Sequence, residues 1–263
     1  MGEFNLTDIR PVIFVGLLMG FGIIEFLLPR RTLRPIKTKR WITNLLIIFI
    51  DSMLVKLLFK TAAIGVALWA GINGYGLFNV IEAPYWLAFG LSFAVLDFSI
   101  WLTHVASHKI PILWKIHRMH HSDVDIDAST GIRFHPFEIV LSMCWKFLVV
   151  LMLGAPVLSV LIFEIFLNGG ALFNHSNIKI PLKFDRVLRW VIVTPDMHRV
   201  HHSVISREHN SNYGFNLSIW DKIFSTYVDQ PEKGHQEMTI GLSDWQDEKP
   251  ARLNWALLVP FKK

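Results

Sequence analysis

The histidines of this chain have a spacing that could form a chemically active site. Nine of the twelve histidines fall into four short clusters: His104 and His108 (HxxxH), His117, His120 and His121 (HxxHH), the single His175, and His198, His201 and His202 (a second HxxHH). On a helix, positions i, i+3 and i+4 share one face, so each cluster directs its imidazoles into one small volume. Imidazole binds iron, copper, nickel and zinc, and nine imidazoles exceed the needs of one ion. The spacing therefore predicts a site for two metal ions.

The other histidines lack this pattern. His209 lies in Arg207-Glu208-His209-Asn210 and His235 lies in a polar tail, and we expect both to be ordinary hydrogen-bonding or surface residues. A pH-sensing histidine patch is an alternative interpretation of the clusters. A sensor does not require repeated ligand spacing, so metal binding is the preferred interpretation.

The composition indicates a membrane protein that positions these clusters. The chain is 52% hydrophobic and only 18% charged, with a mean hydropathy of +0.40. Apolar runs cover residues 11–28, 42–70, 83–103 and 137–173, and such lengths approach or exceed a membrane span. The second run is either one tilted helix or two shorter pieces. The fourth is long enough for two passes and breaks at Gly154-Ala155-Pro156, where proline disfavours a continuing helix.

Charged residues inside the fourth run, Lys146 and Glu164, are costly in hydrocarbon and should face protein, water or the interface.

The expected fold is all-α, an integral membrane bundle of about four or more membrane helices with a cytoplasmic, histidine-rich di-metal cap.

The orientation follows from basic residues directly after the first run. They are Arg30, Arg31, Arg34, Lys37, Lys39 and Arg40. The positive-inside rule places this segment in the cytoplasm, and counting the spans brings all nine histidines to the same face. Topology and anionic lipid headgroups explain the basic excess of 26 Lys+Arg over 21 Asp+Glu more simply than nucleic acid does.

The chain is expected to divide into three segments. Residues 1–82 form N-terminal membrane anchor helices and a basic loop, residues 83–230 form the catalytic segment, and residues 231–263 form a polar C-terminal tail. The single cysteine, Cys144, excludes an internal disulfide, an Fe–S cluster and a cysteine-based zinc finger. We find no GxGxxG and no P-loop, so electrons are expected to come from outside. A site of neutral imidazoles suits Fe(II) that binds oxygen, and the apolar setting favours an apolar substrate entering from the bilayer.

An ordered set of motifs surrounds the histidines between residues 83 and 227. The motifs are Asp97-x3-Trp101-x2-His104-x3-His108, Trp114-x2-His117-x2-His120-His121-Ser122, Arg133-Phe134-His135-Pro136-x-Glu138, Asn174-His175-Ser176-Asn177, Thr194-Pro195-x2-His198-Arg199-Val200-His201-His202-Ser203, Asn212-Tyr213-Gly214 and Leu217-x2-Trp220-Asp221-x2-Phe224-x-Thr226-Tyr227. With these motifs the chain resembles the fatty acid hydroxylase / sterol desaturase superfamily of membrane di-iron oxygenases.

The resemblance implies that the nine clustered histidines are the metal ligands. Some members carry a further histidine four residues before the position of His175, where this chain has Ala171. Water or His135 could fill that place, or His135 could cap the helix that begins near Pro136. Asp97 could orient an imidazole or pair with a nearby base.

Other motif residues have expected roles around the site. Tyr213 and Trp220 are expected to pack the cap. Arg199 would pair with an acidic partner or face the electron donor.

The implied activity is that of a di-iron monooxygenase. It would use two iron ions, O2 and external electrons to hydroxylate, or desaturate, a C–H bond of a lipid or sterol-like substrate. A separate cytochrome b5-like or ferredoxin-like protein would supply the electrons. The expected location is a bacterial inner membrane, with the ER membrane as the alternative. A zinc-dependent membrane hydrolase and a metal-binding or transport protein are the rival functions.

Overall fold

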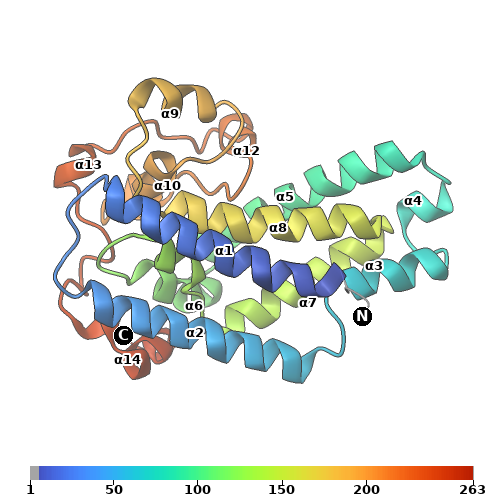
Figure 1. The fold of residues 1–263 in the computed structure, drawn as a ribbon, viewed down its shortest axis with the longest axis horizontal. Helices are drawn as coiled ribbons and strands as arrows, with labels where there is room; N and C mark the ends of the chain where they lie inside the picture. Colours follow the sequence, from blue (N-terminus) through green and yellow to red (C-terminus); the bar gives the residue numbers. More distant parts are fainter. Residues whose placement is uncertain (1–5, 263) are drawn as a thin grey trace.

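The chain folds into long parallel and antiparallel helices that carry a cap at one end (Figure 1). The computed structural model describes residues 6–262, and the ends of the first and last predicted segments, residues 1–5 and 263, lie outside that range. Within the described residues there are helices and three isolated β-bridges but no strand. The predicted all-α membrane bundle is confirmed. Five helical segments are long and apolar enough to cross a membrane.

The long helices are α1 (Leu6–Leu27), α2 (Lys37–Leu58), α5 (Tyr85–Lys109), α7 (Pro136–Leu153) and α8 (Val157–His175). The run at residues 42–70 is two pieces, because α2 ends before α3 (Ala63–Ile72) begins, and α4 (Leu77–Val80) follows. The predicted hairpin is confirmed between α7 and α8. Gly154 adopts a left-handed conformation with φ of 63° at the end of α7, which glycine tolerates best.

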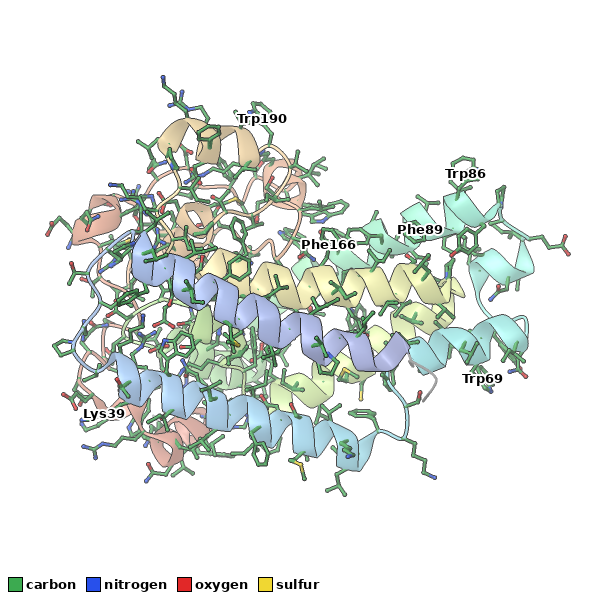
Figure 2. All side chains as sticks on the ribbon, viewed as in Figure 1. Lys39, Trp69, Trp86, Phe89, Phe166 and Trp190 are labelled. Atoms are coloured by element: carbon green, nitrogen blue, oxygen red, sulfur yellow. The ribbon has the colours of Figure 1, made fainter. Side chains whose placement is uncertain are left out.

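The core of the bundle is apolar. Leu96 and Ile100 of α5 pack with Val149 and Val150 of α7 and with Phe163 of α8, all buried. The outer surface is apolar as well. Trp69 and Trp86 point outward near the far end of the bundle, and Trp190 points outward from the cap (Figure 2). Exposed tryptophans near the two ends of a bundle are typical of the membrane–water interfaces.

The cap consists of short helices and the loops between them. They are α6 (Pro111–His121), η1 (Ala128–Ile132), α9 (Leu182–Leu188), α10 (Pro195–His201), α11 (Ser206–His209), α12 (Ile219–Ile223), α13 (Gly234–Glu237), η2 (Lys249–Ala251), α14 (Leu253–Leu257) and η3 (Val259–Phe261). Helices α1, α5 and α8 end at the cap and α2 and α7 begin there (Figure 1). Segments far apart in sequence therefore meet in the cap.

Buried ion pairs fix the cap to the bundle. Arg40 of α2 is fully buried and bonds both carboxylate oxygens of Asp123, at 2.5 and 2.9 Å, and Asp127 at 2.7 Å. Glu25 near the end of α1 accepts hydrogen bonds from the backbone N–H groups of Ala128 (3.0 Å) and Asn177 (3.1 Å). The charges at this end of α1 and α2 therefore connect the spans to the segments that follow the histidine clusters.

The basic segment after α1 is structural as well as a topology signal. Arg30 pairs with Asp196 at 2.9 Å, and Lys39 pairs with Glu248 at 2.9 Å. Arg34 donates to the backbone and side chain of Gln246. The basic residues that predict the orientation of the chain therefore also bind the cap, including its C-terminal part.

Candidate metal centre

The structure brings all nine clustered histidines together at the junction of bundle and cap. They form two groups, and within each group one potential ligand atom per residue lies within 4.8 Å of the others. The groups are His104, His108, His117, His121 and His201, and His120, His175, His198 and His202. Each group draws on more than one sequence cluster. Helices α5, α6 and α10 supply the first group, and α6, α8, α10 and the residue directly after α10 supply the second.

Helix geometry explains how each HxxHH cluster serves both groups. His117 and His121 are four residues apart on α6 and belong to the five-histidine group, whereas His120 turns to the four-histidine group. His201 and His202 divide in the same way at the end of α10. Adjacent residues on a helix point about 100° apart, so a consecutive pair of histidines can face two neighbouring ions.

Hydrogen bonds orient the rings of the five-histidine group. The Nδ1 of His104 donates to the carbonyl of Tyr213 (2.7 Å), and the Nδ1 of His201 donates to the carbonyl of Ser211 (2.6 Å). The Nδ1 of His117 lies 2.7 Å from the carboxylate of Glu138. In all three residues Nε2 is buried and has no hydrogen-bond partner among the described residues. An N–H fixed on one side leaves the lone pair of Nε2 free for a metal ion, an arrangement typical of metal-bound histidine.

The four-histidine group places lone pairs against one another. The Nδ1 of His175 donates to the carbonyl of Ala171 (2.7 Å) and that of His120 donates to the carbonyl of Arg133 (3.2 Å). The Nε2 atoms of these two rings then face each other at 3.0 Å, and that of His198 lies 3.1 Å from that of His175. Ligands of one ion with metal–nitrogen distances of about 2.0–2.1 Å are separated by roughly 3.0–3.4 Å. The donor set therefore fits a metal ion.

Burial keeps the histidines of the cap neutral. It lowers the pKa of His120, His121, His198, His201 and His202 well below the usual value, and neighbouring imidazoles lower it further. A metal ligand must be deprotonated. Desolvation and the repulsion between neighbouring imidazoles therefore keep these side chains unprotonated, the state in which they can bind a metal ion.

His135 lies in neither group. It precedes α7, where its Nδ1 accepts a hydrogen bond from the backbone N–H of Phe137 (3.1 Å) and its Nε2 contacts the carbonyl of Leu257 (3.2 Å). His135 therefore caps α7, which is one of the two roles expected for it. Both nitrogens of its ring form contacts away from the candidate metal centre. Ala171, at the position where some members carry a further histidine, contributes its carbonyl to His175 instead.

Asp97, Tyr213 and Arg199 all lie buried around the site. Asp97 neither orients an imidazole nor pairs with a base: it accepts hydrogen bonds from Asn216 (2.9 Å), the backbone of Leu217 (3.3 Å) and Trp220 (2.8 Å). Tyr213 is buried in the cap, as expected. Arg199 is fully buried and pairs with Asp196, so it has an acidic partner and does not face the solvent.

Two residues beside the histidine groups have places that the sequence does not predict. Glu138, which belongs to the motif that begins at Arg133, holds His117 through its carboxylate. His209 packs its ring on His121 and Trp114, at centroid distances of 4.5 and 4.7 Å. His235 lies elsewhere in the cap, where it is buried and contacts Gln230 at 3.1 Å, in line with the hydrogen-bonding role expected for it.

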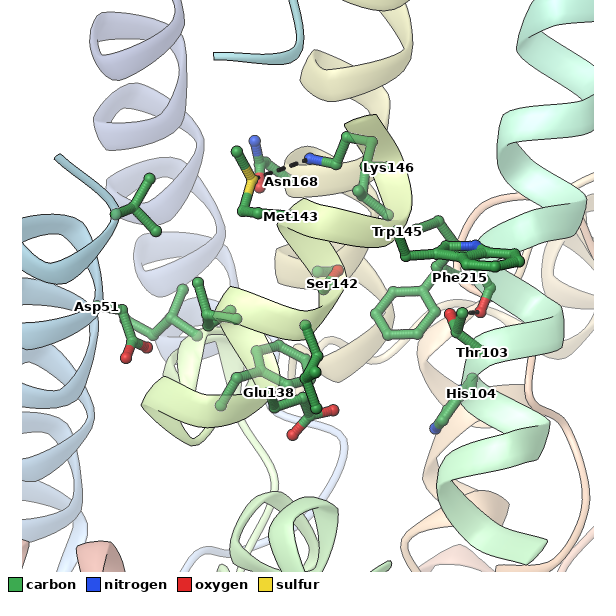
Figure 3. A pocket seen from close by; sticks show the side chains of 18 of the residues that line it. Asp51, Thr103, His104, Glu138, Ser142, Met143, Trp145, Lys146, Asn168 and Phe215 are labelled. Atoms are coloured by element: carbon green, nitrogen blue, oxygen red, sulfur yellow. Dashed lines mark hydrogen bonds between the residues drawn. The ribbon is translucent and has the colours of Figure 1, made fainter. Parts of the chain in front are cut away.

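An apolar cavity of about 660 Å³ runs from the five-histidine group into the bundle. His104 and Glu138 lie toward one end of the cavity in the view of Figure 3, and Lys146 lies toward the other. His117, which bonds Glu138, also lines the cavity. Phe134, Trp145 and Phe215 form part of its wall. A cavity of this size and polarity is suited to one small apolar ligand or a lipid chain.

The comparisons with known proteins give a family for this constellation. A family model described as fatty acid hydroxylase matches residues 89–226, more than half of the chain. The ornithine lipid hydroxylase OlsE of Rhizobium tropici is 29% identical over 156 residues, which cover 57% of this chain and 44% of that protein. The alkylglycerol monooxygenase of Homo sapiens is 30% identical over 164 residues, or 61% of this chain and 35% of that protein.

The alkylglycerol monooxygenase of Xenopus tropicalis is 27% identical over 177 residues, or 64% of this chain and 37% of that protein. In these three alignments the chain spans less than half the length of the relatives it matches. No solved structure matches significantly.

Proposed function

Since this chain belongs to the fatty acid hydroxylase family, we propose that it is a membrane-bound di-iron monooxygenase that hydroxylates a C–H bond of a lipid with O2 and external electrons. The observation that carries the proposal is the pair of histidine groups at the end of an apolar cavity. The relatives named as a lipid hydroxylase and as monooxygenases support the same reaction class.

The histidines are proposed to hold two ions, one in each group. His104, His108, His117, His121 and His201 would hold the first, and His120, His175, His198 and His202 the second. When bound, iron would supply the reduction of O2 and the oxidation of an unactivated C–H bond, chemistry that no amino-acid side chain performs. A set of neutral ligands leaves the ions their full positive charge, which distinguishes this site from carboxylate-bridged di-iron sites.

The protein's own contribution is to orient ligands and hold the substrate. Glu138 accepts a hydrogen bond from Nδ1 of His117, which fixes the tautomer and raises the basicity of the ligand nitrogen. Phe134 and Phe215 lie against His120 and His104, with ring centroids 4.6 and 5.1 Å apart, and Trp145 lines the same cavity. These three side chains would exclude water and hold an alkyl chain against the centre.

The active site is proposed to be cytoplasmic. The basic segment that follows α1 lies at the same end of the bundle as the histidines (Figure 1), and basic segments flanking spans favour the cytoplasm. We infer that a separate redox protein delivers electrons to this face, and that the membrane is a bacterial inner membrane.

Oxygen labelling tests the proposal directly. The purified protein is loaded with Fe(II) and supplied with ¹⁸O2, reduced ferredoxin or cytochrome b5, and a membrane lipid extract. We expect one ¹⁸O atom in a lipid alcohol, and loss of this product in His120→Ala. An unsaturated product without label would assign desaturation instead. Ester cleavage by the zinc-loaded protein, with no oxidised lipid from the iron-loaded protein, would favour a hydrolase and refute the proposal.

A further inference from the structure

Three ionisable side chains from three spans meet at the end of the cavity away from the histidines. Glu164 of α8 accepts hydrogen bonds from Arg10 of α1 and, at 3.1 Å, from the Nζ of Lys146 of α7. Glu164 is 4% exposed and Lys146 is 8% exposed. All three residues line the cavity, so this ionic triad forms part of the proposed substrate-binding site.

The triad has more positive than negative charge. Two cations share the single carboxylate of Glu164, and the Nε of Arg10 is buried without a hydrogen-bond partner among the described residues. The other carboxylates that line the cavity, Asp51 and Glu138, lie toward the opposite end from Lys146 (Figure 3). An uncompensated charge inside a membrane bundle is expensive, and such residues mark binding sites or ion pathways.

An anionic group entering the cavity would supply the missing charge. It would accept hydrogen bonds from Arg10 and Lys146, and its alkyl chain would lie along the apolar wall toward His104. We propose that the ionic triad binds the anionic end of a long-chain amphiphile, a carboxylate being the simplest case. The inference rests on the proposed function, because the same cavity would hold the lipid that is oxidised.

The helices give the distance between this anchor and the histidines. Lys146 lies eight residues after Glu138, the hydrogen-bond partner of His117, on α7, and Glu164 lies eleven residues before His175 on α8. At 1.5 Å per residue these separations are about 12 and 17 Å. An extended alkyl chain advances about 1.3 Å per carbon. The oxidised carbon is therefore expected on the order of ten carbons or more from the anionic end.

Binding measurements with a matched pair of ligands test the triad. The metal-loaded full-length protein is titrated with a fluorescent long-chain carboxylic acid and with the alcohol of the same chain. We expect the acid to bind about tenfold more tightly than the alcohol. Arg10→Gln and Lys146→Met should each remove most of this preference, and Glu164→Gln should increase affinity for the acid because it removes the competing carboxylate.

Two controls separate charge recognition from damage to the fold. Binding of the alcohol should change little in all three variants, which shows that the cavity is intact. Lys60→Met removes an exposed cation that does not line the cavity, and it should leave the acid preference unchanged. Equal binding of acid and alcohol by the wild type, or parallel weakening of both ligands in every variant, would overturn the inference and make the triad a structural ion cluster.

The oxidation products distinguish this inference from the proposed function. Labelled hydroxylation of neutral lipids, with no preference for an acid, would retain the oxygenase and discard the anionic site. Acid binding with the expected charge dependence, without any oxidised product from a working reductant, would retain the site and discard the oxygenase. Oxidation of the acid at a carbon far from its carboxyl group, together with loss of this product in Lys146→Met, would support both the anionic site and the oxygenase.

Discussion

Replacing Arg40 by methionine should destabilise the protein more than any exposed charge substitution. The guanidinium group is fully buried and bonds Asp123 at 2.5 and 2.9 Å, Asp127 at 2.7 Å, the carbonyl of Asp125 at 3.0 Å and Thr130 at 3.1 Å. Methionine has a similar length but no donor. The variant therefore leaves two carboxylates buried without their cation.

The expected cost follows from this environment. Breaking a buried ion pair by removing one partner costs about 3–5 kcal/mol, because the remaining charge stays desolvated. At about 2–4 °C per kcal/mol for a chain near this size, the melting temperature should fall by about 6–20 °C. The matched control is Lys39→Met, whose partner Glu248 and own side chain are 56% and 66% exposed. An exposed pair of this kind contributes about 0–1 kcal/mol.

The pH dependence gives a second signature of the same pair. Burial alone would raise the pKa of Asp123, but the Arg40 guanidinium outweighs it and holds this pKa below the usual value. A depressed carboxyl pKa contributes stability that is present at neutral pH and is lost as the pH falls through the folded-state value. The difference between wild type and Arg40→Met should therefore narrow below about pH 4.

The assay is thermal unfolding in detergent, followed by tryptophan fluorescence and by metal content after gel filtration. We expect Arg40→Met to melt well below both the wild type and Lys39→Met. Equal melting temperatures for the two variants would refute the assignment of Arg40 as a buried link between α2 and the cap.

Three further perturbations have defined outcomes. Gly131→Ala places a Cβ 2.4 Å from the carbonyl oxygen of Ala171, which accepts a hydrogen bond from His175, so elemental analysis should show the loss of about one metal ion per chain. The control Gly90→Ala, whose Cβ would have nothing within 4 Å, should retain this ion. Glu138→Gln weakens the carboxylate bond to its histidine, so metal affinity measured by chelator competition should fall about 10–100-fold; unchanged affinity would contradict the orienting role. Burial lowers the pKa of His235 to about 3, so between pH 6.5 and pH 3 the unfolded state binds more protons than the folded state. The free energy of unfolding therefore falls with falling pH, by up to about 1.4 kcal/mol per pH unit. Chemical unfolding at pH 7 and at pH 5 should show a smaller loss of stability in His235→Gln than in the wild type.

The sequence predicted the spans and their order well, because membrane helices have a strong signal in length and hydropathy. The break at Gly154-Ala155-Pro156 predicted the hairpin that the structure contains. The sequence allows one tilted helix or two pieces in the second run, which the structure divides into α2 and α3. No proline or glycine stands in Phe59–Ala62, the link between them, so the composition did not distinguish one tilted helix from two pieces.

The histidine spacing predicted proximity but not the partition into two groups. That partition depends on where α5, α8 and α10 lie relative to α6, which is tertiary information. The partners of the rings were also beyond reach, because most are backbone carbonyls such as those of Ser211 and Tyr213. A carbonyl carries no sequence signature. Asp97 shows the reverse problem, since the sequence predicts an imidazole or a nearby base as its partner, whereas its hydrogen-bond partners come from residues 216–220.

The interleaving of the two histidine groups has a consequence for biosynthesis. A nascent chain that has emerged through α7 carries His104, His108, His117, His120 and His121, yet the structure divides these between both groups. Each group is completed only by residues from α10 or its end, and the four-histidine group also needs His175. Loop closure across so long a sequence separation is slow compared with helix formation. Insertion of α8 and folding of α10 therefore precede the completion of either group, and metal loading should be a late, post-insertion step.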